Sequence, residues 1–245
     1  MTITIDGCCQ LELGLNSQHD VLKLLERMDR LGIARCVAFP PDECFAWENE
    51  SGNEAMITLM REHPDRIIPA VTVNPWRPNA RQVLLRGLER GGLPAFSPGV
   101  QGLMLSDRKL DTLLQLLMDE KIHRPVYLHT GHHSHGAPSQ LALLAGRFPQ
   151  LNFIMGHSGA TDYSTDVVPV CRMCPNIYIE SSFARPPGFV VKLNQIGFDR
   201  GIFGSGYPFN SVEFEWSEMK RLLPVEHQTA VLGGNLTRLL KEHSA

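Results

Sequence analysis

The stretch HDVLKLLERMDRLGIARCVAFP, residues 19–40, sets the pattern that decides the fold. Its first part places apolar side chains at helical spacing on one face: Val21, Leu24, Leu25, Met28 and Leu31. Residues 35–40 then form a short apolar run of the kind found in buried strands. The stretch therefore predicts an amphipathic helix followed by a buried strand.

The same alternation continues in both directions along the chain. Further helical patterns are NEAMITLMREHP (53–64) and DTLLQLLMDEKIHR (111–124), whereas GGLPAFSPG (91–99) is interpreted as a turn-rich connection before the fourth strand. The predicted strands are residues 2–7, 35–40, 67–74, 100–105, 125–130, 152–157, 176–181 and 201–205. Eight strands, each followed by a helical segment, predict an α/β fold, a single (β/α)8 TIM barrel over residues 1–245. An open doubly wound sheet is the alternative arrangement.

The composition is that of a globular protein and argues against several kinds of partner. The chain has 23 basic and 26 acidic residues and a net charge of -3, with no run of Lys or Arg, so we expect no nucleic-acid partner. No apolar run reaches the ~18 residues of a membrane span, and no signal-peptide pattern begins the chain. The six scattered cysteines favour reduced thiols. We therefore expect a cytoplasmic protein without membrane contact.

Polar side chains follow most of the predicted strands. In a parallel barrel the loops after the strands converge at one face, where chemistry gathers. The candidates are Asp6, Cys8, Gln10, Asp42, Cys44, Asn74, Ser106, Asp107, His129, His157, Glu180, Ser205 and Tyr207. His129 and His157 end adjacent strands, and an imidazole suits either a metal ligand or a general base. Asp6 is expected to orient the first loop.

These residues lie within motifs that resemble the amidohydrolase-related family of TIM barrels. The branch concerned contains 2-amino-3-carboxymuconate semialdehyde decarboxylase, resorcylate-type decarboxylases and lactone hydrolases acting on dicarboxylates. The motifs are HPDRIIPAVTVNP (63–75), RPVYLHTG (124–131), FPQLNFIMGHSGA (148–160), PNIYIESS (175–182), FDRGIFGSGYPF (198–209) and VLGGNLTRLL (231–240). The resemblance covers most of the chain and implies a metal-dependent hydrolase or decarboxylase. It also suggests a homodimer, although no segment marks an interface.

The resemblance implies one divalent metal, most often zinc, on an H-x-H after the first strand, a histidine after the fifth and an aspartate after the eighth. His129 matches the fifth-strand ligand, and His157 matches a sixth-strand histidine that serves as the acid/base. The first-strand motif reads IDGCCQ (5–10), so Cys8 and Gln10 replace the two histidines. GSGYP (204–208) places Gly206 where the aspartate would be. Zinc generally needs three protein ligands, so the family's metal site is predicted to be degenerate.

Other chemistry remains open at these positions. Cys8, His129 and His157 could form a nonstandard zinc site, or Cys8 could be a nucleophile activated by an imidazole. The alternative is that the thiol only fills the volume of a lost ligand. The loop histidines His132, His133 and His135 are expected to be solvated, and Cys171 and Cys174 of CRMC are expected to be packed thiols.

Two functions follow from these alternatives. The first is a binding pseudoenzyme that keeps the barrel and its pocket for a small carboxylate-type molecule, without the family's metal. The second is an active hydrolase or decarboxylase, with His157 as acid/base and a metal on His129, with or without Cys8. In either case Glu180, Arg185 and Tyr207 are the candidates to contact the small-molecule ligand.

Overall fold

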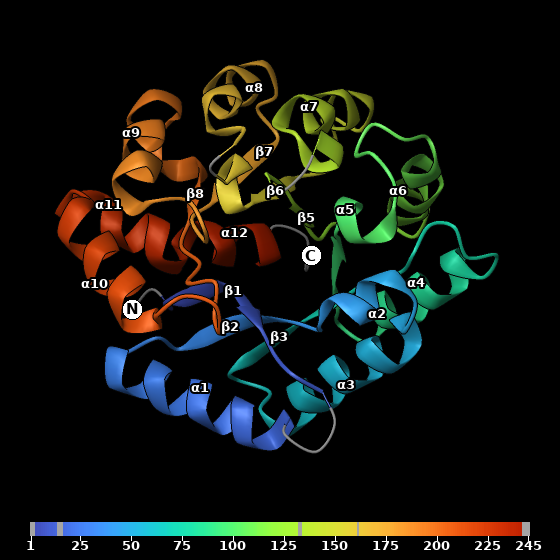
Figure 1. Ribbon diagram of the computed structural model, residues 1–245, viewed down its shortest axis with the longest axis horizontal. Coiled ribbons are helices and arrows are strands. Elements are labelled where there is room, and N and C mark those ends of the chain that lie inside the picture. The colour runs from blue at the N-terminus through green and yellow to red at the C-terminus, as the bar shows by residue number, and fades with distance from the viewer. Residues whose placement is uncertain (1–2, 14–16, 132–133, 161, 242–245) are drawn as a thin grey trace.

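The computed structural model describes residues 3–13, 17–131, 134–160 and 162–241. The strands are β1 (Ile5–Gln10), β2 (Arg35–Phe39), β3 (Ile67–Val71), β4 (Leu93–Phe96), β5 (Val126–His129), β6 (Phe153–Gly156), β7 (Ile177–Glu180) and β8 (Gly201–Ile202). The α-helices are α1 (Ser17–Leu31), α2 (Asp42–Ala46), α3 (Asn49–Glu62), α4 (Ala80–Glu89), α5 (Pro98–Gln101), α6 (Lys109–Asp119), α7 (Pro138–Arg147), α8 (Val167–Met173), α9 (Pro186–Ile196), α10 (Val212–Leu222), α11 (Val225–Thr229) and α12 (Asn235–Lys241). Figure 1 shows the helices as a ring around the strands.

The strands form one parallel sheet in chain order, from β1 to β8. The sheet closes on itself through hydrogen bonds between β1 and the segment after β8: Gly7 N–H donates to Phe203 O at 2.8 Å and Gln10 N–H donates to Tyr207 O at 2.7 Å. A Cβ on Gly7 would lie 2.8 Å from the Phe203 carbonyl oxygen, so only glycine permits this approach. The predicted (β/α)8 barrel is confirmed, and the open sheet is not formed.

The fourth strand was predicted in the wrong place. It is Leu93–Phe96, within the segment interpreted as a turn-rich connection, and not residues 100–105. Pro94 and the neighbouring glycines are typical of turns, so the local composition does not indicate this four-residue strand. It nevertheless pairs with both β3 and β5. The predicted stretch instead contains the end of α5 and a left-handed turn at Gly102, φ 66°. Its apolar side chains, Leu103 and Leu105, pack against the helical layer.

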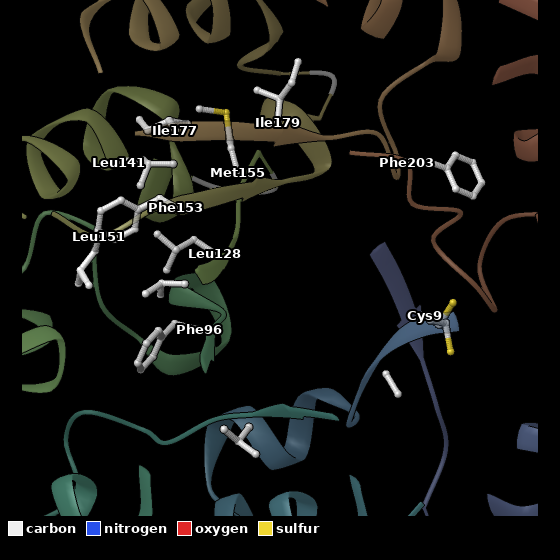
Figure 2. Packing of buried hydrophobic residues seen from close by; sticks show 14 of the residues in the cluster. Cys9, Phe96, Leu128, Leu141, Leu151, Phe153, Met155, Ile177, Ile179 and Phe203 are labelled. Carbon is white, nitrogen blue, oxygen red and sulfur yellow. The ribbon is translucent and has the colours of Figure 1, made fainter. Parts of the chain in front are cut away.

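Two apolar layers hold the barrel together. The larger lies between the strands and the surrounding helices, and Figure 2 shows part of it, including Phe153, Met155, Ile177 and Phe203. The face predicted for residues 19–33 belongs to this layer, because Val21, Leu24, Leu25 and Met28 are buried. Cys9, Cys171 and Cys174 also pack there as free thiols.

The smaller layer fills the barrel interior. It contains Ile5, Val37, Ile154 and Ile202 from the strands, together with Leu236 and Leu239 of α12. Asn235 anchors this helix by donating from Nδ2 to the carbonyl of Gly201 at 2.7 Å, at the start of β8. The helix α12 therefore closes the end where the strands begin, and the opposite end remains available for a site. No helix among the described residues combines the length and apolar character that crossing a membrane requires.

Candidate functional site

A cavity of about 480 Å³ lies at the end of the barrel where the strands finish. Six of the predicted strand-end residues line it: Cys8, Gln10, Asp42, His129, His157 and Tyr207. Phe39, Phe183 and Phe209 supply aromatic walls, and Gly206 lies at the same wall as Tyr207. The first strand runs to residue 10 and not to residue 7, so Cys8 and Gln10 sit within β1 and not beyond it. The cavity is in the place that the topology predicts.

His129 and His157 are in direct contact at the base of the cavity. His129 Nδ1 and His157 Nε2 are 2.8 Å apart, which is a hydrogen bond between two imidazoles. Three aromatic rings meet His129 edge-on, with centroids 5.0–5.3 Å away: Phe39, Phe45 and Tyr127. Phe183 meets His157 edge-on at 4.9 Å. Aromatic packing therefore fixes both imidazole rings in place.

The backbone at His157 adopts a strained turn that aims its side chain at the cavity. His157 and Ser158 have positive φ values of 65° and 45°, which non-glycine residues rarely adopt. Glu180 of β7 holds this turn, because its Oε2 accepts from His157 N–H at 3.1 Å and its carbonyl accepts from Ser158 Oγ at 2.6 Å. The turn therefore depends on the neighbouring strand.

Glu180 is fully buried beneath the cavity and does not line it. Its carboxylate accepts from Tyr127 Oη at 2.8 Å, from Ser182 Oγ at 2.7 Å, and from the backbone N–H groups of His157 and Ser182. Burial raises the pKa of Glu180, and these hydrogen bonds lower it. The structure places this residue under the histidine pair, whereas the sequence had suggested contact with a ligand.

Cys8 shares this buried region. Its side chain is 4% exposed, and it interacts with Tyr127 and Ser182. Burial raises the pKa of the Cys8 thiol well above its ordinary value, and the charge of Glu180 raises it further. A thiol of this kind stays protonated at neutral pH and is a poor nucleophile. The environment therefore disfavours the activated-thiol interpretation.

The remaining candidates are placed as follows. Asp6 joins β1 to the segment after β8, since its Oδ1 accepts from the N–H groups of Cys8 at 3.2 Å and Ser205 at 2.8 Å. Tyr207 lines the cavity, and its hydroxyl donates to Asp20 of α1. Arg185 is exposed at the start of α9, away from the described cavity wall. The other predicted strand-end residues outside the described cavity lining are Cys44, Asn74, Ser106, Asp107 and Ser205. Of the histidine-rich loop, His132 and His133 lie outside the described residues.

By distance alone, one group among the described residues could hold a metal ion. Cys8, His157 and Glu180 each offer a ligand atom, and these atoms lie within 4.8 Å of one another. His129, the predicted fifth-strand ligand, is not in this group but contacts His157. The roles predicted for these residues remain predictions.

Two contributors to the site escaped sequence analysis, namely Tyr127 and Ser182. Tyr127 lies inside an apolar strand, where a buried hydroxyl needs a partner, and this need is the one signal the sequence offers. Ser182 belongs to the polar run ESS at the end of β7, of which only Glu180 was selected.

The buried carboxylates also affect a neighbouring helix. Glu215 of α10 is 9% exposed, and its pKa is raised to about 7 from 4.5, first by burial and then by the charges of Glu180 and Asp6. The folded protein therefore binds more protons than the unfolded chain between these pH values, so stability falls as the pH rises through this window.

The free energy of unfolding of wild type is expected to fall between pH 4.5 and pH 7, and we expect Glu215→Gln to reduce this fall by about 2 kcal/mol. Urea unfolding of both proteins at the two ends of the window measures it, with the exposed Glu226→Gln as control. Equal pH slopes in wild type and Glu215→Gln would contradict it.

The parallel barrel with a histidine-lined cavity at the ends of its strands defines the class, a TIM-barrel protein with its site at the usual face. The family model described as amidohydrolase (Amidohydro_2) matches residues 22–241. The chain therefore belongs to the amidohydrolase family, as the resemblance implied. No curated protein matches the chain in sequence.

Solved structures share the fold at low sequence identity. A dihydroxybenzoic acid decarboxylase from Polaromonas sp. JS666, with bound manganese and the inhibitor 2-nitroresorcinol, superposes with a TM-score of 0.78 at 14% identity, covering 100% of this chain and 98% of that one. The 5-carboxyvanillate decarboxylase from Novosphingobium aromaticivorans, with manganese and 4-hydroxy-3-methoxy-5-nitrobenzoic acid, superposes with a TM-score of 0.78 at 15% identity. The match covers 98% of this chain and 96% of that one. A probable 2-pyrone-4,6-dicarboxylic acid hydrolase from Acinetobacter baumannii, with citric acid bound, superposes with a TM-score of 0.73 at 16% identity. The match covers 98% of this chain and 99% of that one. These structures are similar to this chain in fold.

Proposed function

We propose that this barrel binds a small carboxylate-type molecule in the cavity and does not use the metal-dependent chemistry of its family. The observation that carries the proposal is the hydrogen-bond network of His157, Ser182 and Glu180, which already engages the atoms that a metal would need. The barrel and the cavity are kept, while the residues at three of the family's ligand positions are Cys8, Gln10 and Gly206.

The donor set of the candidate group does not fit a divalent metal as it is arranged. Both ring nitrogens of His157 are in hydrogen bonds, with Ser182 Oγ at 2.7 Å and with His129. Both carboxylate oxygens of Glu180 accept hydrogen bonds. Cys8 would have to ionise, and burial and the charge of Glu180 oppose this. A metal on these three residues would therefore displace several buried hydrogen bonds, which is costly.

The walls of the cavity favour a small planar acid. Phe39, Phe183 and Phe209 provide apolar faces. Among the described residues that line the cavity, only His129 and His157 can acquire a positive charge near neutral pH. A carboxylate would therefore be attracted by this positive charge, with Tyr207 as a further polar contact. Three structural neighbours were solved with small acidic or phenolic molecules, which supports this ligand class.

The second candidate is an active hydrolase or decarboxylase with a nonstandard metal site on His129, His157 and Cys8. The manganese in two structural neighbours and the closeness of Cys8 to His157 favour it. It predicts that zinc or manganese copurifies with the chain and is lost when either Cys8 or His129 is replaced.

Metal content and ligand binding together test the proposal. Protein purified without an affinity tag and then dialysed against Mn²⁺ or Zn²⁺ is expected to hold far less than one ion per chain by mass spectrometry. Calorimetry with 4-hydroxy-3-methoxy-5-nitrobenzoate is expected to show binding that His129→Ala weakens about tenfold, while His63→Ala, at the far end of α3, leaves it unchanged. Stoichiometric metal that disappears in both Cys8→Ala and His129→Ala would overturn the proposal in favour of the metal-dependent enzyme.

A further inference from the structure

Two polar side chains in the wall of the cavity have hydrogen-bonding capacity that the protein does not use. Gln10 ends β1, Ser97 directly follows β4, and both line the cavity. Within the described part of the chain, neither the Gln10 carboxamide nor the Ser97 hydroxyl has a hydrogen-bond partner. A carboxamide offers two donors and an acceptor, and a hydroxyl offers one donor and can also accept. Both groups can therefore bind a molecule that enters the cavity.

The setting of Ser97 shows that its hydroxyl is not used to build the fold. Ser97 is 9% exposed and occupies the N-cap position of α5, where a serine hydroxyl usually accepts from the backbone of the first turn. It makes no such hydrogen bond here. Gln101 holds the Ser97 backbone instead, since its Oε1 accepts from Ser97 N–H at 2.9 Å and its own N–H donates to the Ser97 carbonyl at 2.9 Å. A buried hydroxyl needs a partner, which a molecule in the cavity can supply.

Gln10 is held by its backbone, so its carboxamide remains available at the cavity wall. Its N–H donates to the Tyr207 carbonyl at 2.7 Å, and the residue is paired with Phe39 of β2. The side chain is half-buried. In the closed sheet β1 and β4 are three strands apart, so Gln10 and Ser97 lie on different sides of the same cavity.

The other polar side chains of the described lining already interact within the protein: Cys8, Asp42, His129, Thr130, His157 and Tyr207. The Thr130 hydroxyl, for example, donates to the Gly156 carbonyl at 2.6 Å. No Lys or Arg belongs to the described lining. Gln10 and Ser97 are therefore the uncharged groups with which a ligand can form new hydrogen bonds without breaking existing ones.

We infer that Gln10 and Ser97 set the specificity of the cavity by binding uncharged hydrogen-bonding groups of the ligand, such as a carboxamide or a hydroxyl. A second carboxylate would meet these neutral side chains with no Lys or Arg beside them, and its transfer from water costs more than that of a neutral group. The cavity then selects acids that carry a neutral polar substituent over dicarboxylates. The inference rests on the proposed function only for the first carboxylate of the ligand.

Calorimetry with benzoate, isophthalate, terephthalate and the monoamides of these two diacids tests the inference. Wild type is expected to bind one of the monoamides about tenfold more tightly than benzoate, as one or two new hydrogen bonds would give. Both dicarboxylates are expected to bind more weakly than their monoamides. Gln10→Leu and Ser97→Ala are each expected to reduce the preference for the monoamide over benzoate, and the double variant is expected to abolish it.

Gln195→Leu of α9 and Ser217→Ala of α10 are the matched controls, because both side chains are exposed and lie outside the described cavity lining. Thermal unfolding checks that every variant is folded. A wild type that prefers the dicarboxylates would overturn the inference. So would a double variant that loses the same factor in affinity for benzoate and for the monoamide. In both cases the proposed binding of a carboxylate still stands.

Benzamide separates the inference from the proposed function, because it carries the neutral group without an acid. If benzamide binds, the double variant abolishes this binding and benzoate does not bind to wild type, the inference stands and the proposed ligand class fails. If none of these probes binds to wild type, both fail.

Discussion

Glu180→Ala is expected to lower the free energy of unfolding by about 3–4 kcal/mol. The carboxylate accepts from Tyr127 Oη, Ser182 Oγ and the backbone N–H groups of His157 and Ser182, and all of these donors are buried. Alanine leaves them without an acceptor, and each buried donor left in that state costs about 1–3 kcal/mol. The lost side chain also leaves a void between β7 and the histidine pair.

One effect opposes this loss. Burial raises the pKa of Glu180, so the ionised carboxyl group is less favourable in the folded protein than in water, and its removal recovers part of that cost. Glu180→Gln separates the two contributions, because the amide keeps one acceptor oxygen and carries no charge. We expect its destabilisation to be less than that of alanine.

Urea unfolding measures these differences, with Glu26→Ala on the exposed face of α1 as the control. A change for Glu180→Ala within about 0.5 kcal/mol of the control, the range of ordinary surface substitutions, would show that the hydrogen bonds do not hold the turn at His157 in place. In that case calorimetry would also show that Glu180→Ala binds the ligand as the wild type does.

The sequence was sufficient for the architecture because the barrel repeats one physical unit. Each apolar strand must be covered by a helix, and both periodicities are visible locally, as in residues 19–40. The fourth strand shows the limit of this approach. Leu93–Phe96 has four residues and contains Pro94, so its pairing with β3 and β5 is a consequence of the closed sheet and not of local propensity.

The candidate site was partly predictable for the same reason. His129 and His157 follow adjacent strands, so the topology places them together, and the structure brings them into contact. The buried contacts were not predictable, because they depend on which way side chains turn beneath the cavity. Ser182 looks like an ordinary loop serine, and Glu180 looks like a ligand contact until its hydrogen bonds are seen.

Restoring the family pattern with Cys8→His, Gln10→His and Gly206→Asp is expected to create binding of one Mn²⁺ or Zn²⁺ per chain where the wild type holds none. The two introduced imidazoles, the introduced carboxylate and His129 would supply four donors. Four donors meet the usual requirement of a zinc site.

The substitutions also carry a structural cost. Gly206 has φ 76°, and a Cβ there would lie 3.0 Å from Asn210 Nδ2 and 3.2 Å from Phe183, although aspartate tolerates this backbone region better than most residues. A larger side chain at the buried Cys8 overpacks the barrel interior, at about 1–3 kcal/mol. We therefore expect the metal-free triple variant to melt below the wild type, and saturating metal to recover about 3 kcal/mol at a hundred times the dissociation constant.

Mass spectrometry for bound metal and thermal unfolding with and without Mn²⁺ test this expectation. The matched control carries the same first two substitutions with Gly206→Asn, which has nearly the same shape as aspartate but no charge. Metal bound by the aspartate variant and far less by the asparagine variant would show that loss of the carboxylate, together with the two imidazoles, removed the metal from this barrel. If neither variant binds metal, residues 8, 10 and 206 do not correspond to the family's ligand positions, and the proposal of a degenerate metal site fails with that correspondence.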